Sequence, residues 1–223
     1  MARPIIKWSK LSNRQLNQLI RLFVLEVSAV RAAKEVRVNR HSAERVYTVI
    51  RECIVKACEK ESPLDGEVEV DESYFGGKQK YGRGRKVITK VPVFGILKRD
   101  GRVYTTPVED VSRYTLRQII AQKVPPGSTI YSDSFSSYDG LITAGYKHHR
   151  INHQRIFAKK RNHINGIENF WGFAKTKLRK YYGISRPRFF LYLKEMEFRF
   201  NHRNEDLLAI TRKIVRRYSN LLD

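Results

Sequence analysis

The sequence predicts an α/β domain with a mixed sheet flanked by helices, preceded by a separate all-α unit. Apolar residues repeat at helical spacing through residues 12–60, whereas short alternating runs typical of strands appear only after the turn-like stretch at residues 62–66. Strands and helices are then interspersed, as in α/β domains. With 223 residues, 41% of them hydrophobic, the chain is long enough to bury a sizeable core.

Three helices are expected in the first 60 residues, capped by Ser12 or Asn13, by Ser28 and by Asn39. A short helix, a three-residue turn at residues 37–39 and a longer basic helix are typical of the helix-turn-helix, whose second helix enters the major groove. The turn carries Arg37 where such turns usually have glycine. An ordinary helical bundle is the alternative. The residues expected on the exposed, DNA-facing side of the longer helix are Arg40, His41, Arg45, Thr48 and Arg51.

From residue 66 onward the pattern predicts strands, with Asp100-Gly101 as a hairpin turn. The strands are expected at residues 67–74, 87–98, 102–108, 128–132 and 146–151. The helices are expected at residues 112–122, 136–144, 161–180, 187–203 and 205–220. The chain is therefore divided into a helical DNA-binding domain at residues 1–62, an α/β domain at 63–204 and a basic C-terminal helix at 205–223.

Charge is the strongest global signal. Lys and Arg total 44 against 22 Asp and Glu, a net charge of +22, which favours a nucleic acid as partner. Between residues 111 and 194 only three carboxylates occur, Asp133, Asp139 and Glu168. A carboxylate within a phosphate-binding surface repels the ligand unless a cation lies between them, so these acids are candidate metal ligands.

Two of these acids, together with Asp71, lie in distinctive segments. Asp71 lies late in an apolar-alternating strand but cannot be separated from Glu72 by pattern alone, and a solvent-facing residue on an edge strand is its alternative. Asp133 follows a short strand, and a helix N-cap is its alternative. Glu168 and Lys175, two helical turns apart, lie at the rim of an apolar stripe, and a surface ion pair is their alternative.

The segments VEVDESYFGG, IYSDSFSSYDGL and HINGIENFWGFAKTKLRK resemble the signature blocks of ISXO-type insertion-sequence transposases, a branch of the DDE superfamily. The resemblance covers about residues 64–203 and implies a ribonuclease H-like fold. It implies a catalytic triad of Asp71, Asp133 and Glu168, with Lys175 assisting at the DNA. Some relatives carry Asn as the third residue, and Asn165 is available. Glu168 is preferred because a carboxylate binds Mg²⁺ better than an amide does.

The expected function is therefore DNA transposition. The enzyme would bind terminal inverted repeats, hydrolyse the phosphodiester at the element ends and join the 3′-hydroxyl to target DNA. Two Mg²⁺ (or Mn²⁺) ions are expected. A metal-dependent nuclease of the same fold and a stand-alone DNA-binding regulator are the alternatives. Further contacts to double-stranded DNA are expected from Lys78, Lys80, Arg83, Arg85, Lys86, Arg161, Lys177 and Arg179.

The remaining expectations concern assembly and location. The resemblance implies a homodimer or larger synaptic assembly, because two DNA ends are held at once. A cytoplasmic, nucleoid-associated protein is expected, since no secretory signal or long apolar segment is seen. Cys53 and Cys58 lack a second pair at zinc-site spacing and are expected to be reduced thiols.

Overall fold

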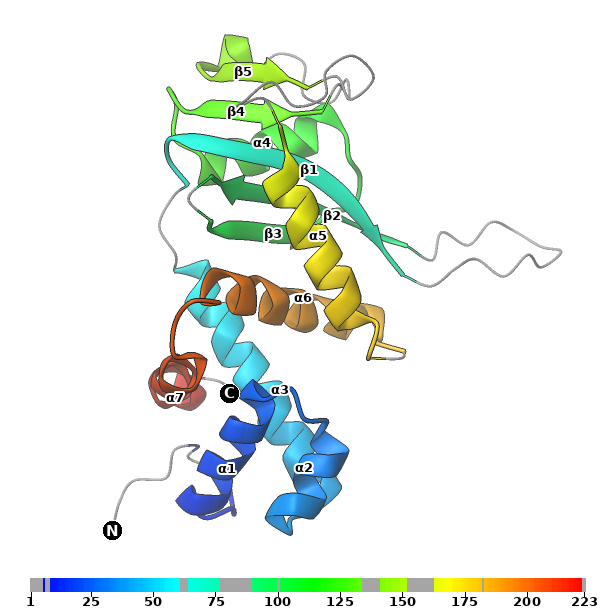
Figure 1. The fold of residues 1–223 in the computed structure, drawn as a ribbon, viewed down its shortest axis with the longest axis vertical. Helices are drawn as coiled ribbons and strands as arrows, with labels where there is room; N and C mark the ends of the chain where they lie inside the picture. Colours follow the sequence, from blue (N-terminus) through cyan, green and yellow to red (C-terminus); the bar gives the residue numbers. More distant parts are fainter. Residues whose placement is uncertain are drawn as a thin grey trace, which may run out of the picture. The chain divides into compact units, whose positions relative to one another are not determined.

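The structure is a computed structural model that describes residues 6, 9–60, 64–76, 90–99, 101–133, 141–151, 163–181 and 183–221 (Figure 1). The chain forms two compact units. One comprises Met1–Glu61 with Lys194–Asp223, and the other comprises Ser62–Leu193. The division between Leu193 and Lys194 falls within helix α6 (Arg186–Asn201).

The first unit is helical. Its helices α1 (Asn13–Val24), α2 (Ala29–Val36), α3 (Arg40–Glu59) and α7 (Leu207–Tyr218) share one hydrophobic core. The predicted caps are confirmed: Ser12 forms a capping box with Gln15, and Ser28 and Asn39 accept backbone N–H groups at the starts of α2 and α3. Local hydrogen bonding thus sets where each of the first three helices begins.

The turn between α2 and α3 depends on a left-handed residue. Arg37 has φ 55° and ψ 51°, and the N–H of Val38 donates to the carbonyl of Ala33 at 2.9 Å. Glycine usually occupies such a position because a Cβ makes the left-handed region unfavourable. The arginine noted in the sequence therefore adopts the conformation that glycine normally supplies.

The last helix is part of this core. Ile214, Val215 and Tyr218 of α7 pack with residues of α1 and α3, as does Phe198 of α6. The sequence had set residues 205–223 apart as a basic helix and assigned residue 198 to the α/β domain. Both assignments are corrected, because the apolar side of α7 is needed to complete the helical core.

One candidate DNA contact is also corrected. Arg51, expected on the exposed side of α3, is only 5% exposed and its Nε lies 2.7 Å from Oε2 of Glu195. Arg199 Nε lies 2.9 Å from the other oxygen of the same carboxylate. Two cations therefore share one buried anion, and Arg51 is turned into the core by a partner 144 residues away.

The second unit contains a five-stranded mixed sheet in the order β3-β2-β1-β4-β5. The strands are β1 (Glu67–Phe75), β2 (Val91–Lys98), β3 (Val103–Pro107), β4 (Thr129–Ser132) and β5 (Lys147–Arg150). The first three pair antiparallel as consecutive hairpins, whereas β4 is parallel to β1 and β5 is parallel to β4. The prediction of an α/β architecture with a mixed sheet is confirmed.

Two helices pack on the sheet. Leu116 and Ile120 of α4 (Arg113–Lys123) share a core with Val68 and Val70 of β1, whereas α5 (Asn165–Leu178) contacts β1 and β2. Side chains alternate between the faces of a strand, so Glu69 and Asp71 lie on the opposite face from Val68 and Val70. Figure 1 shows α5 lying across the strands.

Two minor elements complete the description, η2 (Ile142–Ala144) and η3 (Ser219–Leu221). Of the helix expected at residues 136–144, residues 136–140 lie outside the described residues, and the rest forms only the short 3₁₀ helix η2. Among the described residues, no helix is both long enough and apolar enough to cross a membrane.

Candidate active site

Asp71 lies where α5 packs against β1. Its Oδ2 accepts a hydrogen bond of 3.0 Å from Nε1 of Trp171, which belongs to α5. Asp71 pairs across the hairpin with Gly95, where an added Cβ would lie 2.6 Å from Cζ2 of Trp171. The indole can therefore approach the sheet and reach Asp71 only because residue 95 has no side chain.

Asp133 lies beside Asp71 by strand register. In the parallel pair of β1 and β4, Glu69 is opposite Tyr131, and Asp71 and Asp133 each follow two residues later, Asp133 directly after the end of β4. Neighbouring strands are about 4.8 Å apart, and residues two apart point to the same face. The two carboxylates that the sequence singled out separately thus come from neighbouring segments of the sheet, and the charge of Asp133 contributes to the raised pKa of Asp71.

The environment of Asp71 disfavours its negative charge. Its pKa is raised from 3.8 to about 7, mainly by burial and then by the neighbouring charges of Glu72 and Asp133, against the lowering effect of the Trp171 hydrogen bond. A carboxyl that resists ionisation in isolation is well suited to a cation, because a nearby positive charge offsets both the burial and the repulsion.

Glu69 is a residue that the sequence argument missed. The residue is 1% exposed, and its Oε2 accepts the backbone N–H of Ile167 at 3.0 Å in the first turn of α5. Its Oε1 lies 3.3 Å from Arg99 Nε and 3.5 Å from His163 Nδ1. A carboxylate at a helix N-terminus is favourable to the helix dipole, so Glu69 anchors the start of the helix that carries Glu168.

The contact between Glu69 and the start of α5 explains why the NGIE segment carries a glycine at residue 166. A Cβ on Gly166 would lie 2.8 Å from Glu69 Oε2 and 2.9 Å from Leu97 Cδ2. The close approach of helix and strand therefore requires glycine. Two features of the sequence could have indicated this contact. Glu69 shares a strand face with Asp71, and Gly166 stands at the start of the predicted helix that carries Glu168.

Glu168 and Lys175 lie on α5 as the helical pattern predicted, and both are exposed. Lys175 Nζ lies 5.7 Å from the centre of the Phe75 ring. Lys175 and Arg179 line a hollow of about 510 Å³ together with Arg186, which the sequence did not single out. Basic side chains thus gather at the C-terminal end of the helix that carries Glu168.

The third acid does not complete a metal site in this structure. Among the described residues, no three His, Cys, Asp or Glu side chains lie close enough together to hold one ion. Asp71 and Asp133 come from β1 and from the end of the neighbouring β4, whereas Glu168 belongs to α5, the helix that packs against β1. Its neighbour Asn165 is also exposed.

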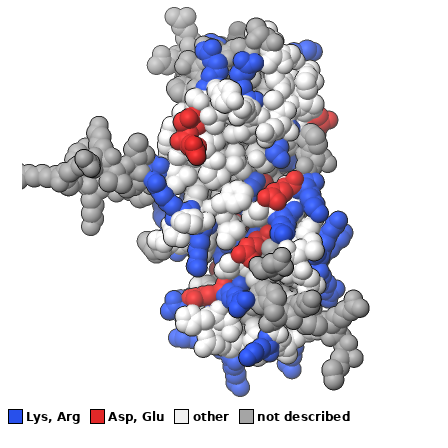
Figure 2. All heavy atoms as spheres, turned by 180° about the vertical axis from the view of Figure 1, so that it is seen from behind, with Lys and Arg blue, Asp and Glu red and all other residues white. Residues whose placement is uncertain are grey.

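Some of the candidate DNA contacts lie on α3 and α5, and others fall outside the described residues. Arg40, His41 and Arg45 are exposed on α3, where Arg40 pairs with Glu44 at 2.7 Å, whereas the half-buried hydroxyl of Thr48 donates to the carbonyl of Glu44. On α5, Lys177 Nζ lies 5.9 Å from the centre of the Phe173 ring. The described residues do not include six of the candidate DNA contacts or the acid Asp139; these contacts are Lys78, Lys80, Arg83, Arg85, Lys86 and Arg161. Figure 2 shows basic side chains spread over the face in view, with acidic ones in a few small groups.

Comparison with known proteins identifies the family. The mixed sheet and its paired carboxylates define an α/β protein with a candidate acidic active site. The chain belongs to the family of the ISXO2-like transposase domain, which matches residues 63–201, and this confirms the resemblance seen in the sequence.

Individual relatives carry similar descriptions. An uncharacterized transposase-like protein of Haemophilus influenzae is 46% identical over 116 residues, covering 52% of this chain and 94% of that protein. An uncharacterized protein in transposable element ISH50 of Halobacterium salinarum is 25% identical over 154 residues, covering 61% of this chain and 52% of that protein. Among solved structures, a pre-cleavage Mos1 transpososome aligns over 93% of this chain and 80% of its own, with 12% identity and a TM-score of 0.35.

Proposed function

We propose that this transposase hydrolyses the phosphodiester at the ends of its element and joins the freed 3′-hydroxyl to target DNA, with Asp71, Asp133 and Glu168 as its acidic residues. The observation that supports this chemistry is the position of Asp71 in β1 and of Asp133 directly after the neighbouring parallel strand β4, where the charge of Asp133 contributes to the raised pKa of Asp71. The strand order also fits the ribonuclease H-like fold implied by the sequence.

The residues present fit divalent metal ions. Asp71 and Asp133 offer carboxylate oxygens, the ligands that Mg²⁺ and Mn²⁺ prefer, and a bound cation would offset the burial and repulsion that raise the pKa of Asp71. Glu168 is exposed at the edge of α5 and is the proposed third ligand. Two bound divalent ions would activate the attacking oxygen and stabilise the leaving oxygen of an in-line displacement.

The protein's own residues hold this arrangement. Trp171 fixes the orientation of the Asp71 carboxylate, and Glu69 fixes the start of the helix that carries Glu168. Lys175, with Arg179, would contact the phosphate backbone next to the scissile bond. Preorganised groups of this kind lower the activation barrier because no reorientation is needed during the reaction.

The helical unit is the proposed DNA-recognition element. α2, the left-handed turn at Arg37 and α3 follow one another as in a helix-turn-helix, with Arg40, His41, Arg45 and Thr48 available on α3. We propose that this helix reads the terminal inverted repeats. A homodimer or larger assembly would hold the two ends of the element, and the protein would be cytoplasmic and associated with the nucleoid. Arg51 is left out of this set because it is buried against Glu195.

An oligonucleotide assay tests the proposal. The full chain should nick a duplex that carries the ends of its element in the presence of Mg²⁺ or Mn²⁺ and not with chelator. Asp133→Ala should abolish nicking while DNA binding persists. Glu109→Gln, an exposed acid in the same unit, is the matched control and should nick normally. Nicking that survives Asp133→Ala would mean that the site is wrongly assigned.

Plasmid integration separates the proposal from its rivals. Insertion of the cut end into a target plasmid supports the transposase chemistry. Metal-dependent cutting without insertion indicates a nuclease of the same fold. Binding without any metal-dependent cutting indicates a regulator.

A further inference from the structure

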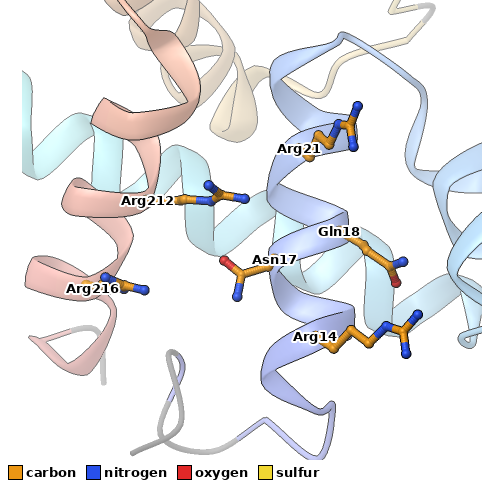
Figure 3. A pocket seen from close by; sticks show the side chains of 6 residues that line it. All are labelled: Arg14, Asn17, Gln18, Arg21, Arg212 and Arg216. Carbon is orange, nitrogen blue, oxygen red and sulfur yellow. The ribbon is translucent and has the colours of Figure 1, made fainter.

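Four arginines surround one hollow on the surface of the helical unit, and they do not belong to the proposed recognition helix. The hollow has a volume of about 530 Å³. Figure 3 shows Arg212 and Arg216 extending from α7 toward α1, with Asn17 on the side of α1 that faces them. The full lining is Arg14, Asn17, Gln18 and Arg21 of α1 and Arg212 and Arg216 of α7.

The charge of this hollow is not neutralised within the described part of the chain. None of its four arginines forms a salt bridge there, although the same unit pairs Arg51 and Arg199 with a buried glutamate. Arg212 is half-buried, and its Nε is buried without a hydrogen-bond partner among the described residues. Clustered like charges repel one another, and a buried donor without an acceptor is unfavourable, so the hollow is suited to an anion.

The shape of the cluster indicates an extended anion rather than a single small one. Arg14, Gln18 and Arg21 follow the i, i+4, i+7 spacing along α1, which spans about 10 Å. One strand of duplex DNA places a phosphate about every 3.4 Å along the helix axis, so this row corresponds to about three successive phosphates. Arg212 and Arg216, one turn apart on α7, add a second basic row.

We propose that the hollow between α1 and α7 binds the phosphodiester backbone of duplex DNA, as a contact surface additional to α3. Arginine donates paired hydrogen bonds to phosphate oxygens, and the amides of Asn17 and Gln18 are further donors. Contacts of this kind position the protein on DNA without reading its sequence. This inference depends on the proposed function in one respect, namely that the polyanion bound by the protein is DNA.

The test measures binding of the full chain to a short random-sequence DNA duplex at several salt concentrations, with chelator present. Arg14→Gln/Arg21→Gln and Arg212→Gln/Arg216→Gln should each reduce the slope of log affinity against log salt by about 2, since each lost phosphate contact reduces it by about 1. The loss should be similar for a duplex carrying the ends of the element. Chelator keeps this result separate from a failure of the cleavage chemistry.

The matched control removes two charges from the same helix outside the hollow. Lys213 and Arg217 are exposed on α7 and do not line it. Lys213→Gln/Arg217→Gln should change the slope by less than half as much as the hollow variants. An equal reduction in this control, or no reduction in both hollow pairs, would overturn the proposal, as would a change in oligomeric state without a change in DNA binding.

Thermal unfolding measurements show whether the variants are folded. They also distinguish binding of duplex DNA from binding of inorganic phosphate. At low salt the hollow variants should unfold at the same temperature as the parent protein or higher, because repulsion is relieved. Duplex DNA should raise the unfolding temperature of the parent more than that of the variants. Equal stabilisation of the parent by inorganic phosphate at the same phosphate concentration would indicate a small-anion site and overturn the assignment to DNA. If Arg212→Gln prevents folding, the exposed pair Arg14 and Arg21 still decides the question.

Discussion

The indole Nε1 of Trp171 donates a hydrogen bond of 3.0 Å to Oδ2 of Asp71, joining the helix that carries Glu168 to the central strand of the sheet. The bond connects residues 100 positions apart and stabilises the ionised form of a carboxyl whose pKa is raised to about 7, mainly by burial. Trp171 is therefore a positioning residue that also adjusts the charge of the proposed metal ligand.

Trp171→Phe should move the acid side of the pH profile for DNA nicking to higher pH. Phenylalanine keeps the apolar ring near Gly95 but cannot donate, and a hydrogen bond to a charged group contributes about 1.5 kcal/mol, or roughly one pH unit. Phe173→Leu, which removes an aromatic ring from the same helix without loss of a donor, is the control. An unchanged profile in Trp171→Phe would contradict the role assigned to this bond.

Asp71→Asn should stabilise the metal-free protein at pH 8. The pKa of Asp71 rises from 3.8 to about 7 on folding, so between about pH 4 and pH 7 the folded state retains a proton that the unfolded state has released. Stability therefore falls as pH rises through this window, and the neutral amide removes that loss. The gain by urea unfolding should be roughly 2–4 kcal/mol at pH 8 and should disappear below pH 4.

The control for this prediction has the opposite sign. Asp110 is exposed, and hydrogen bonds with Ser112 and Thr115 lower its pKa. Asp110→Asn should therefore slightly destabilise the protein at pH 8 and lose this effect as pH falls below the ordinary range of a carboxyl. Equal behaviour of the two variants would mean that the environment of Asp71 is not as described.

Two glycines of α5 should respond oppositely to alanine. Gly166→Ala places a Cβ 2.8 Å from Glu69 Oε2 and 2.9 Å from Leu97 Cδ2, and crowding of this kind costs about 1–3 kcal/mol. Gly172→Ala meets nothing within 4 Å and should stabilise the protein by about 0.5–1 kcal/mol through helix propensity. Denaturant unfolding measures both, and a neutral Gly166→Ala would argue against the close approach of helix and strand.

Glu195→Ala should destabilise the helical unit by about 3–5 kcal/mol, because Arg51 and Arg199 would then be buried without their shared anion. Glu44→Ala removes the exposed pair with Arg40, whose side chain is 65% exposed, and should cost no more than about 0.5 kcal/mol. Urea unfolding of the two variants compares a buried ion pair with a surface one. Similar losses would contradict the burial of Glu195.

The sequence by itself predicted the local elements and the candidate acids of the proposed site. Ser12, Ser28 and Asn39 set the helix starts because a cap requires only residues a few positions away. Alternation and turns predicted the strands for the same reason. Asp133 and Glu168 were singled out by the scarcity of acids between residues 111 and 194, and the resemblance of three segments to a transposase family implied Asp71 as the third acid.

Only the tertiary structure decided which side chains meet. The burial of Arg51 depends on Glu195, 144 residues away, and the role of Glu69 depends on Ile167, 98 residues away. The hollow of four arginines exists because the core draws α7 toward α1. Periodicity reports which face of a helix is apolar, whereas the partner of a charge is set by packing between distant segments, which no local pattern encodes.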